Sequence, residues 1–176
     1  KLHAHRDGGM GTPETKAGVL TISDKGAQGL RADESGDLVA RMLHDQGITV
    51  ARQAIVPDDL EQIVHTLTTW VDHEGLALII TTGGTGLSPR DLTPQAMKQL
   101  IDYEVPGMAD AMRAESLKKT PHAMLSRAMA GVRKASLIIN LPGSPRGAME
   151  NLQVILPALP HGLSKLAGDP TECAVP

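Results

Sequence analysis

A glycine-rich turn that follows an apolar strand and ends in an arginine and an aspartate offers the clearest chemistry in this sequence. Residues 78–91 read Leu-Ile-Ile-Thr-Thr-Gly-Gly-Thr-Gly-Leu-Ser-Pro-Arg-Asp. The glycines let the backbone approach a ligand closely, and loops of this kind turn free N–H groups toward anions. With Arg90 and Asp91 at its exit, the turn predicts a phosphate-bearing ligand and a carboxylate that holds a metal ion over it.

A second carboxylate follows another strand, in Pro57-Asp58-Asp59-Leu60-Glu61. Mg²⁺ favours one or two carboxylates together with substrate phosphates, so Asp58 and Asp91 are predicted to share this ion. Both also have a plainer interpretation, which stays open: Asp58 suits a helix N-cap completed by Glu61, and Asp91 suits a cap on the turn before Thr93-Pro94. Two lesser candidates for the ion lie in the loop after the first strand: Asp24 and Asp33.

Several familiar motifs are absent. The sequence has no Gly-x-x-x-x-Gly-Lys-Ser/Thr and no Gly-x-Gly-x-x-Gly after the first strand, which argues against a P-loop NTPase and a Rossmann dinucleotide site. Ser126 lacks the Gly-x-Ser-x-Gly elbow of a hydrolase nucleophile, so we expect it to make a structural or ligand hydrogen bond. A phosphate-ester hydrolase would need such a nucleophile or a two-metal cluster, and neither is visible.

Composition restricts the partners. The 176 residues have a formal net charge of −3, one Trp, one Tyr and no Phe. Nucleic-acid sites rely on aromatic platforms or a basic surface, so nucleic acid is not an expected partner. Cys173 is the only cysteine, which favours a reducing compartment, the cytosol. No apolar run approaches the ~18 residues of a membrane span, so no membrane association is expected.

Apolar runs alternate with amphipathic segments. Strands are expected over residues 18–23, 49–56, 76–82 and 135–141, and a polar loop over 24–32. Helices are expected over 34–46 with Asp33 as N-cap, after Pro57-Asp58, from Thr93 as N-cap, near Pro106, and within 146–166. This alternation predicts one α/β domain whose mostly parallel sheet is covered on both faces, with ligands bound outside the carboxyl ends of its strands.

The domain is expected to span residues 17–167. A flexible N-terminal leader over 1–16 and a polar C-terminal tail over 168–176 complete the predicted organisation.

The motifs occur in an order that resembles a known family. They are Ser23-Asp24, Pro57-Asp58-Asp59, Thr82-Gly83-Gly84-Thr85-Gly86, Arg90-Asp91-x-Thr93-Pro94, Glu104-x-Pro106-Gly107, Glu115-Ser116-Leu117, Leu125-Ser126-Arg127 and Ile139-Asn140-Leu141-Pro142-Gly143-Ser144-Pro145. Over about residues 18–166 the chain is similar to the molybdopterin adenylyltransferase family. That family comprises single-domain bacterial enzymes and the G domains of plant and animal molybdenum-cofactor proteins such as gephyrin.

The resemblance implies a three-layer domain, assembled as a homotrimer, that uses Mg-ATP to adenylylate the terminal phosphate of molybdopterin and releases pyrophosphate. Asp58 and Asp91 would be catalytic and would hold the Mg²⁺, and hand-over of the product to a molybdenum insertase is part of the expectation. Arg90 is predicted to be an additional phosphate contact. The implied pterin contacts are Ser116, Ser126 and Asn140. The glycine loops that would hold phosphate and nucleotide comprise Gly83, Gly84, Thr85 and Gly86, and Gly143 and Ser144, and Ser23 is a further implied substrate or nucleotide contact.

A non-catalytic alternative stays open, because this fold also occurs as scaffold modules and as paralogues that do not adenylylate. An insertase would be expected to carry further domains. A silent paralogue would more readily have lost one aspartate, whereas Asp58 and Asp91 are both present.

Overall fold

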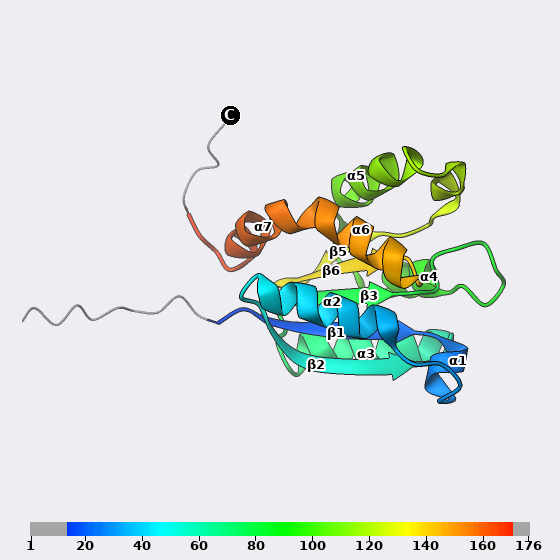
Figure 1. The fold of residues 1–176 in the computed structure, drawn as a ribbon. Coiled ribbons are helices and arrows are strands. Elements are labelled where there is room, and N and C mark those ends of the chain that lie inside the picture. The colour runs from blue at the N-terminus through cyan, green and yellow to red at the C-terminus, as the bar shows by residue number, and fades with distance from the viewer. Residues whose placement is uncertain (1–13, 171–176) are drawn as a thin grey trace, which may run out of the picture.

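Six strands form one sheet in the order β2-β1-β3-β6-β5-β4 in the computed structural model, which describes residues 14–170 (Figure 1). Four strands run parallel: β1 (Lys16–Ile22), β2 (Thr49–Val56), β3 (Leu78–Thr82) and β6 (Ser136–Leu141). Two short strands add an antiparallel edge: β4 (Tyr103–Glu104) and β5 (Ala130–Arg133). The predicted mostly parallel α/β sheet is confirmed.

Helices pack on both faces and make three layers (Figure 1). One face carries α2 (Glu34–Asp45), α5 (Pro106–Leu117), α6 (Pro145–Ile155) and α7 (Leu159–Leu166). The other carries α3 (Leu60–Asp72) and α4 (Thr93–Leu100). Three short elements complete the fold: α1 (Asp24–Ala27) and the 3-10 turns η1 (Pro121–Leu125) and η2 (Leu156–Ala158). No helix among residues 14–170 has both the length and the apolarity needed to cross a bilayer.

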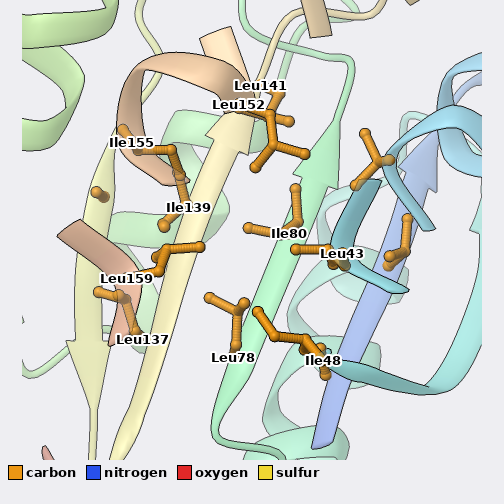
Figure 2. Packing of buried hydrophobic residues seen from close by; sticks show 14 of the residues in the cluster. Leu43, Ile48, Leu78, Ile80, Leu137, Ile139, Leu141, Leu152, Ile155 and Leu159 are labelled. Carbon is orange, nitrogen blue, oxygen red and sulfur yellow. The ribbon is translucent and has the colours of Figure 1, made fainter. Parts of the chain in front are cut away.

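The central strand β3 contributes to two cores, because successive side chains of a strand point to opposite faces. Its Leu78 and Ile80 pack with Leu43 and Leu152 under the α2–α6 layer, as Figure 2 shows. Ile79 packs on the opposite side, against the α3–α4 layer. This burial on both faces explains why the strand is a continuous apolar run, and each such side chain contributes about 1.5–3 kcal/mol to folding.

Some local predictions were wrong. The segment expected to be a loop after β1 begins with the short helix α1, which Ser23 caps by accepting the N–H of Gly26 at 3.0 Å. Thr93 does not cap α4: it is the first helical residue, it is buried, and Leu92 occupies the cap position. The edge strands β4 and β5 were not predicted.

The predicted domain limits remain predictions. β1 starts at Lys16, inside the range expected to be a leader. Most of the two predicted end segments, residues 1–13 and 171–176, lies outside the described residues.

Candidate functional site

The carboxyl ends of the four parallel strands meet at one edge of the sheet, and the loops that leave them line two neighbouring hollows. The first hollow measures about 590 Å³ and is lined by Ser23, Asp33, Ser35, Asp58, Gly83, Gly84, Asp91, Gly143 and Ser144, among others. The second measures about 370 Å³ and is lined by Thr85, Gly86, Ser116, Ser126, Pro142, Ser144 and Asn151, among others. The glycine turn after β3 and the turn after β6 contribute to both hollows, and Ser144 lines both.

The glycine turn is shaped by close backbone contacts. Gly83 and Gly84 adopt φ values of +103° and +69°, in the left-handed region. A Cβ atom on Gly83 would lie 2.3 Å from the carbonyl oxygen of Ile22, and one on Gly84 would lie 2.3 Å from Oγ1 of Thr93. The Thr93 hydroxyl donates to the carbonyl of Gly83 at 2.8 Å and fixes the turn against the start of α4. Only glycine fits these two positions without displacing the turn.

Asp58 is held by Asp24, the first residue of α1, and does not cap α3. The N-cap of that helix is Asp59, whose side chain accepts the N–H of Gln62 at 3.0 Å, so the capping interpretation of Asp58 was wrong. Instead, Oδ2 of Asp58 accepts the N–H of Asp24 at 3.0 Å, and the N–H of Asp58 donates to Oδ1 of Asp24 at 3.0 Å. This reciprocal pair leaves Oδ1 of Asp58 without a hydrogen bond from the described residues, at 3.5 Å from where a Cβ of Gly84 would lie.

Arg90 reaches back to Asp24. Its Nε donates to Oδ2 of Asp24 at 3.0 Å and its Nη2 to Oδ1 at 2.9 Å, a two-point charged contact. These hydrogen bonds hold the pKa of the Asp24 carboxyl below its usual value. Both Asp24 oxygens are therefore committed to protein donors. Arg90 lines neither hollow, so its predicted phosphate contact stays a prediction.

Asp91 closes the turn that it ends. Its Oδ2 accepts the N–H of Ser88 at 3.0 Å, while its own N–H donates to the carbonyl of Ser88 at 2.9 Å. The carboxylate thus caps this turn, as one interpretation of the sequence expected, and it also lines the first hollow. Its Oδ1 has no hydrogen bond from the part of the chain that the structure describes.

Negative charge is concentrated beside Asp58. Burial raises the pKa of the Asp58 carboxyl, and the charges of Asp24 and Asp91 act in the same direction. The backbone N–H of Asp24 and the cation of Arg90 oppose the rise. A cation bound between Asp58 and Asp91 would relieve this repulsion, and each carboxylate keeps one oxygen for it.

The donor set suits Mg²⁺, which takes one or two carboxylates and completes its shell with phosphate oxygens and water. Within residues 14–170, no group of three or more His, Cys, Asp or Glu side chains is arranged to hold a metal ion. Asp33, a lesser candidate from the sequence, accepts the Thr21 hydroxyl at 2.8 Å and caps α2 through the N–H of Gly36 at 3.0 Å.

Two long helices begin at the first hollow. The N-cap of α2 is Asp33, and that of α6 is Ser144, whose Oγ accepts the N–H of Gly147 at 3.1 Å. Ser35 donates to the carbonyl of Gly143 at 2.7 Å and so links the two helix starts. Helix N-termini carry partial positive charge and free N–H groups, so they favour an anion in the space that they border.

The second hollow receives two of the predicted pterin contacts, Ser116 from α5 and Ser126 from the loop after η1. The third, Asn140, is fully buried in β6 and lines neither hollow. Its Oδ1 accepts the N–H of Met129 at 3.1 Å, and its Nδ2 donates to the Thr81 hydroxyl at 2.9 Å. In this structure Asn140 braces the sheet behind the site, and its predicted pterin contact stays a prediction.

Among the site residues that sequence reasoning missed, Arg127 and Asn151 make the most informative side-chain contacts. Arg127, in the loop after η1, binds two points of the loop between β3 and α4: its Nε donates to the carbonyl of Gly86 at 2.8 Å and its Nη2 to that of Asp91 at 2.8 Å. Gly86 lines the second hollow and Asp91 lines the first. Asn151 lines the second hollow from α6. Arg127 stood in the Leu-Ser-Arg motif but received no role, and nothing in the sequence around Asn151 indicated its position.

Comparison with known proteins identifies the family to which the chain belongs. The model of the probable molybdopterin binding domain matches residues 18–161. Gephyrin of Dictyostelium discoideum is 42% identical over 177 residues, which cover 94% of this chain and 24% of gephyrin. The molybdopterin adenylyltransferase of Helicobacter pylori strain J99 is 38% identical over 154 residues, which cover 86% of this chain and 88% of that enzyme.

A solved structure is also similar. The molybdopterin biosynthesis enzyme MoaB of Thermus thermophilus superposes with a TM-score of 0.84 at 50% identity, covering 90% of this chain and 99% of that one. The match to the domain model spans most of the folded part and includes every loop that forms the two hollows. The chain therefore belongs to the family of probable molybdopterin binding domains, to which the adenylyltransferase and gephyrin relatives point as well.

Proposed function

We propose that this protein is a molybdopterin adenylyltransferase, which transfers AMP from Mg-ATP to the terminal phosphate of molybdopterin and releases pyrophosphate. The observation that carries the proposal is the adjacency of the two hollows across one glycine turn. The first offers free carboxylate oxygens and helix N-termini, whereas the second offers hydroxyl and amide groups together with the charged side chains of Arg113, Lys119 and Glu150. The name of the Helicobacter pylori relative, which this chain matches over most of its length, supports the same reaction.

In this proposal the first hollow takes the nucleotide. Asp58 and Asp91 would hold Mg²⁺ through their free oxygens, and the ion would supply positive charge that offsets the triphosphate and favours the departure of pyrophosphate. Backbone N–H groups of Gly84–Gly86 and of the Gly143-Ser144 turn would face the non-bridging oxygens, and Ser23 would contribute its hydroxyl. The N–H of Gly83 donates to the carbonyl of Leu141 at 3.1 Å, so Gly83 would contribute through the shape of the turn.

The second hollow takes molybdopterin, with Ser116 and Ser126 as hydrogen-bonding groups. An oxygen of the terminal phosphate of molybdopterin attacks the α-phosphorus of ATP, and the bond from that phosphorus to the pyrophosphate oxygen breaks. The chain contributes position and charge compensation, which suffice for transfer between two phosphates without a protein nucleophile. Arg127 would hold the walls of the two hollows in place, since it binds Gly86 in the wall of the second and Asp91 in the wall of the first.

The assembly and setting are part of the proposal. We expect a homotrimer in the cytosol that passes adenylylated molybdopterin to a molybdenum insertase, and a domain that spans residues 17–167. Light scattering on the purified protein measures the trimer directly, and limited proteolysis followed by mass spectrometry measures the domain limits. A monomer in solution would contradict the proposed assembly.

The reaction is tested by mixing the purified protein with molybdopterin and Mg-ATP and measuring pyrophosphate and the adenylylated pterin. Both products should require both substrates, and Asp91→Asn should abolish them. Asp45→Asn serves as the control, because its side chain is 78% exposed at the far end of α2. Binding of both substrates without any product in the wild type would favour the non-catalytic scaffold instead.

A further inference from the structure

We propose that Asn151 is a specificity-determining residue of the second hollow, which reads the aminopyrimidinone edge of the pterin ring. The inference rests on the proposed function, because it takes molybdopterin as the occupant of that hollow. It adds a residue for which neither the sequence motifs nor the comparisons give a role.

The orientation of the Asn151 amide follows from its partners. Its Nδ2 lies 2.8 Å from the carbonyl oxygen of Gly147 and 3.2 Å from Oγ of Ser116. Since a carbonyl oxygen can only accept a hydrogen bond, the amide nitrogen must face Gly147, and its two hydrogens serve these two acceptors. The amide oxygen therefore points away from both.

The amide oxygen is left for a ligand. The Asn151 residue is only 8% exposed, and it lines the second hollow. No donor from the described residues reaches its Oδ1. Every fully buried side-chain polar atom of the described chain has a hydrogen-bond partner, so an oxygen without one is not fully buried. The Oδ1 atom of Asn151 therefore retains accessible surface. An accessible amide oxygen without a protein donor is free to accept a hydrogen bond from a ligand in the hollow.

Ser116 provides the complementary group. Its Oγ accepts the N–H of Asn151, so its own hydrogen is directed elsewhere, and no acceptor among residues 14–170 takes it. Asn151 and Ser116 thus place an acceptor and a donor side by side on one wall of the hollow.

This pair selects the kind of group that it can bind. A phosphate presents acceptors alone, so its oxygens would be repelled by the amide oxygen of Asn151. A heterocycle edge that carries an N–H donor beside a ring acceptor matches both groups. The apolar lining residues Ala123, Leu125 and Pro142 suit the faces of a flat ring. The aminopyrimidinone edge of a pterin has this chemistry, and we assign it to this wall.

The test compares two fluorescent ligands without ATP: 6-hydroxymethylpterin and 6-hydroxymethyllumazine, in which a carbonyl oxygen replaces the amino group. The wild type should bind the pterin at least about tenfold more tightly, because lumazine presents a carbonyl oxygen to the amide oxygen of Asn151 where the pterin presents its amino group. Asn151→Leu should remove this preference. Gln153→Ala, on the exposed side of the same helix, should keep it.

The same two affinities are measured for Asn151→Ala, and the thermal melting of both variants is recorded. If one variant is misfolded, the other still tests the inference. Equal affinities in the wild type, or an undiminished preference in either folded variant, would overturn the inference. The adenylylation assay separates the two proposals. A wild type that discriminates through Asn151 but forms no adenylylated pterin contradicts the proposed function alone. A wild type that forms it while the variants keep their preference contradicts only this inference.

Discussion

Replacing Gly84 by alanine should damage both stability and activity, because two separate costs fall on this position. Its φ of +69° lies in the left-handed region, which costs a residue with a Cβ atom about 1 kcal/mol or more. The new Cβ would also lie 2.3 Å from Oγ1 of Thr93. That hydroxyl would have to move away from the buried carbonyl of Gly83, to which it donates at 2.8 Å.

The second cost can be separated from the first by a matched control. Gly47, after α2, has a similar φ of +75°, and a Cβ there would meet nothing within 4 Å. Gly47→Ala should therefore cost only about 1 kcal/mol. Gly84→Ala should cost about 3 kcal/mol in all, because loss of a buried hydrogen bond adds about 1–3 kcal/mol. At roughly 3 °C per kcal/mol for a chain of this size, the melting temperatures should fall by about 3 °C and about 9 °C.

The assay combines thermal melting with adenylylation below both melting transitions. Because Oδ1 of Asp58 lies beside the turn, Gly84→Ala should also lower kcat/KM by about 100-fold, the effect of a displacement of about 1 Å at a reacting centre. Gly47→Ala should retain wild-type activity. Equal melting temperatures in the two variants would refute the steric argument, and wild-type activity in Gly84→Ala would refute the role of the turn.

Three further predictions follow from the same contacts. Asp24→Asn breaks the two-point contact with Arg90 and should lower kcat/KM about tenfold, because Asp58 is then held less firmly. Wild-type kinetics in this variant would contradict the prediction. Hydrogen bonds from Arg133 hold the pKa of Asp72 well below its usual 3.8, so this carboxylate stabilises the fold above that pH and progressively less as the pH falls below it. Asp72→Asn should therefore lower the melting temperature strongly at pH 7 and less near pH 2, and equal losses at both would contradict this. Ile80→Ala should cost about 2–5 kcal/mol in urea denaturation, because the side chain is fully buried, and a loss under 1 kcal/mol would contradict the packing.

Much of the fold could be predicted because its elements carry strong local signals. The strand predicted over 49–56 coincides with β2, and Asp33 caps α2 as expected, since both depend on neighbouring residues. The edge strands β4 and β5 escaped prediction because they have two and four residues, too few to show a period. Their pairing is a property of the folded sheet.

Several residues that line the two hollows were predicted from the sequence, but the hydrogen bonds between them were not. Pro57-Asp58-Asp59 offers two adjacent aspartates, and local rules cannot say which of them caps the helix. The choice depends on Asp24, which lies 34 residues from Asp58 and binds it in both directions. Arg90, at the exit of the glycine turn, binds a carboxylate 66 residues away, a pairing that no local pattern indicates, and its contact with a phosphate stays a prediction.

Contacts between helices were the least predictable part. Asn151 and Ser116 are 35 residues apart in the sequence and form a hydrogen bond where α6 packs against α5. The hydrophobic periodicity of a helix does not indicate which of its polar side chains will face a hollow. Asn140 is the opposite case: the resemblance implies a ligand contact for it, but in this structure its side chain is fully buried in β6.

The most direct measurement of the central claim follows radioactive phosphorus from the α-position of ATP. The protein is incubated with molybdopterin, Mg²⁺ and labelled ATP, and the pterin fraction is separated and counted. We predict one label per pterin in the wild type, none with ATP labelled at the γ-position, and none with Asp58→Asn or Asp91→Asn. Label in the pterin from the γ-position, or transfer that survives in Asp91→Asn, would contradict adenylylation at this site.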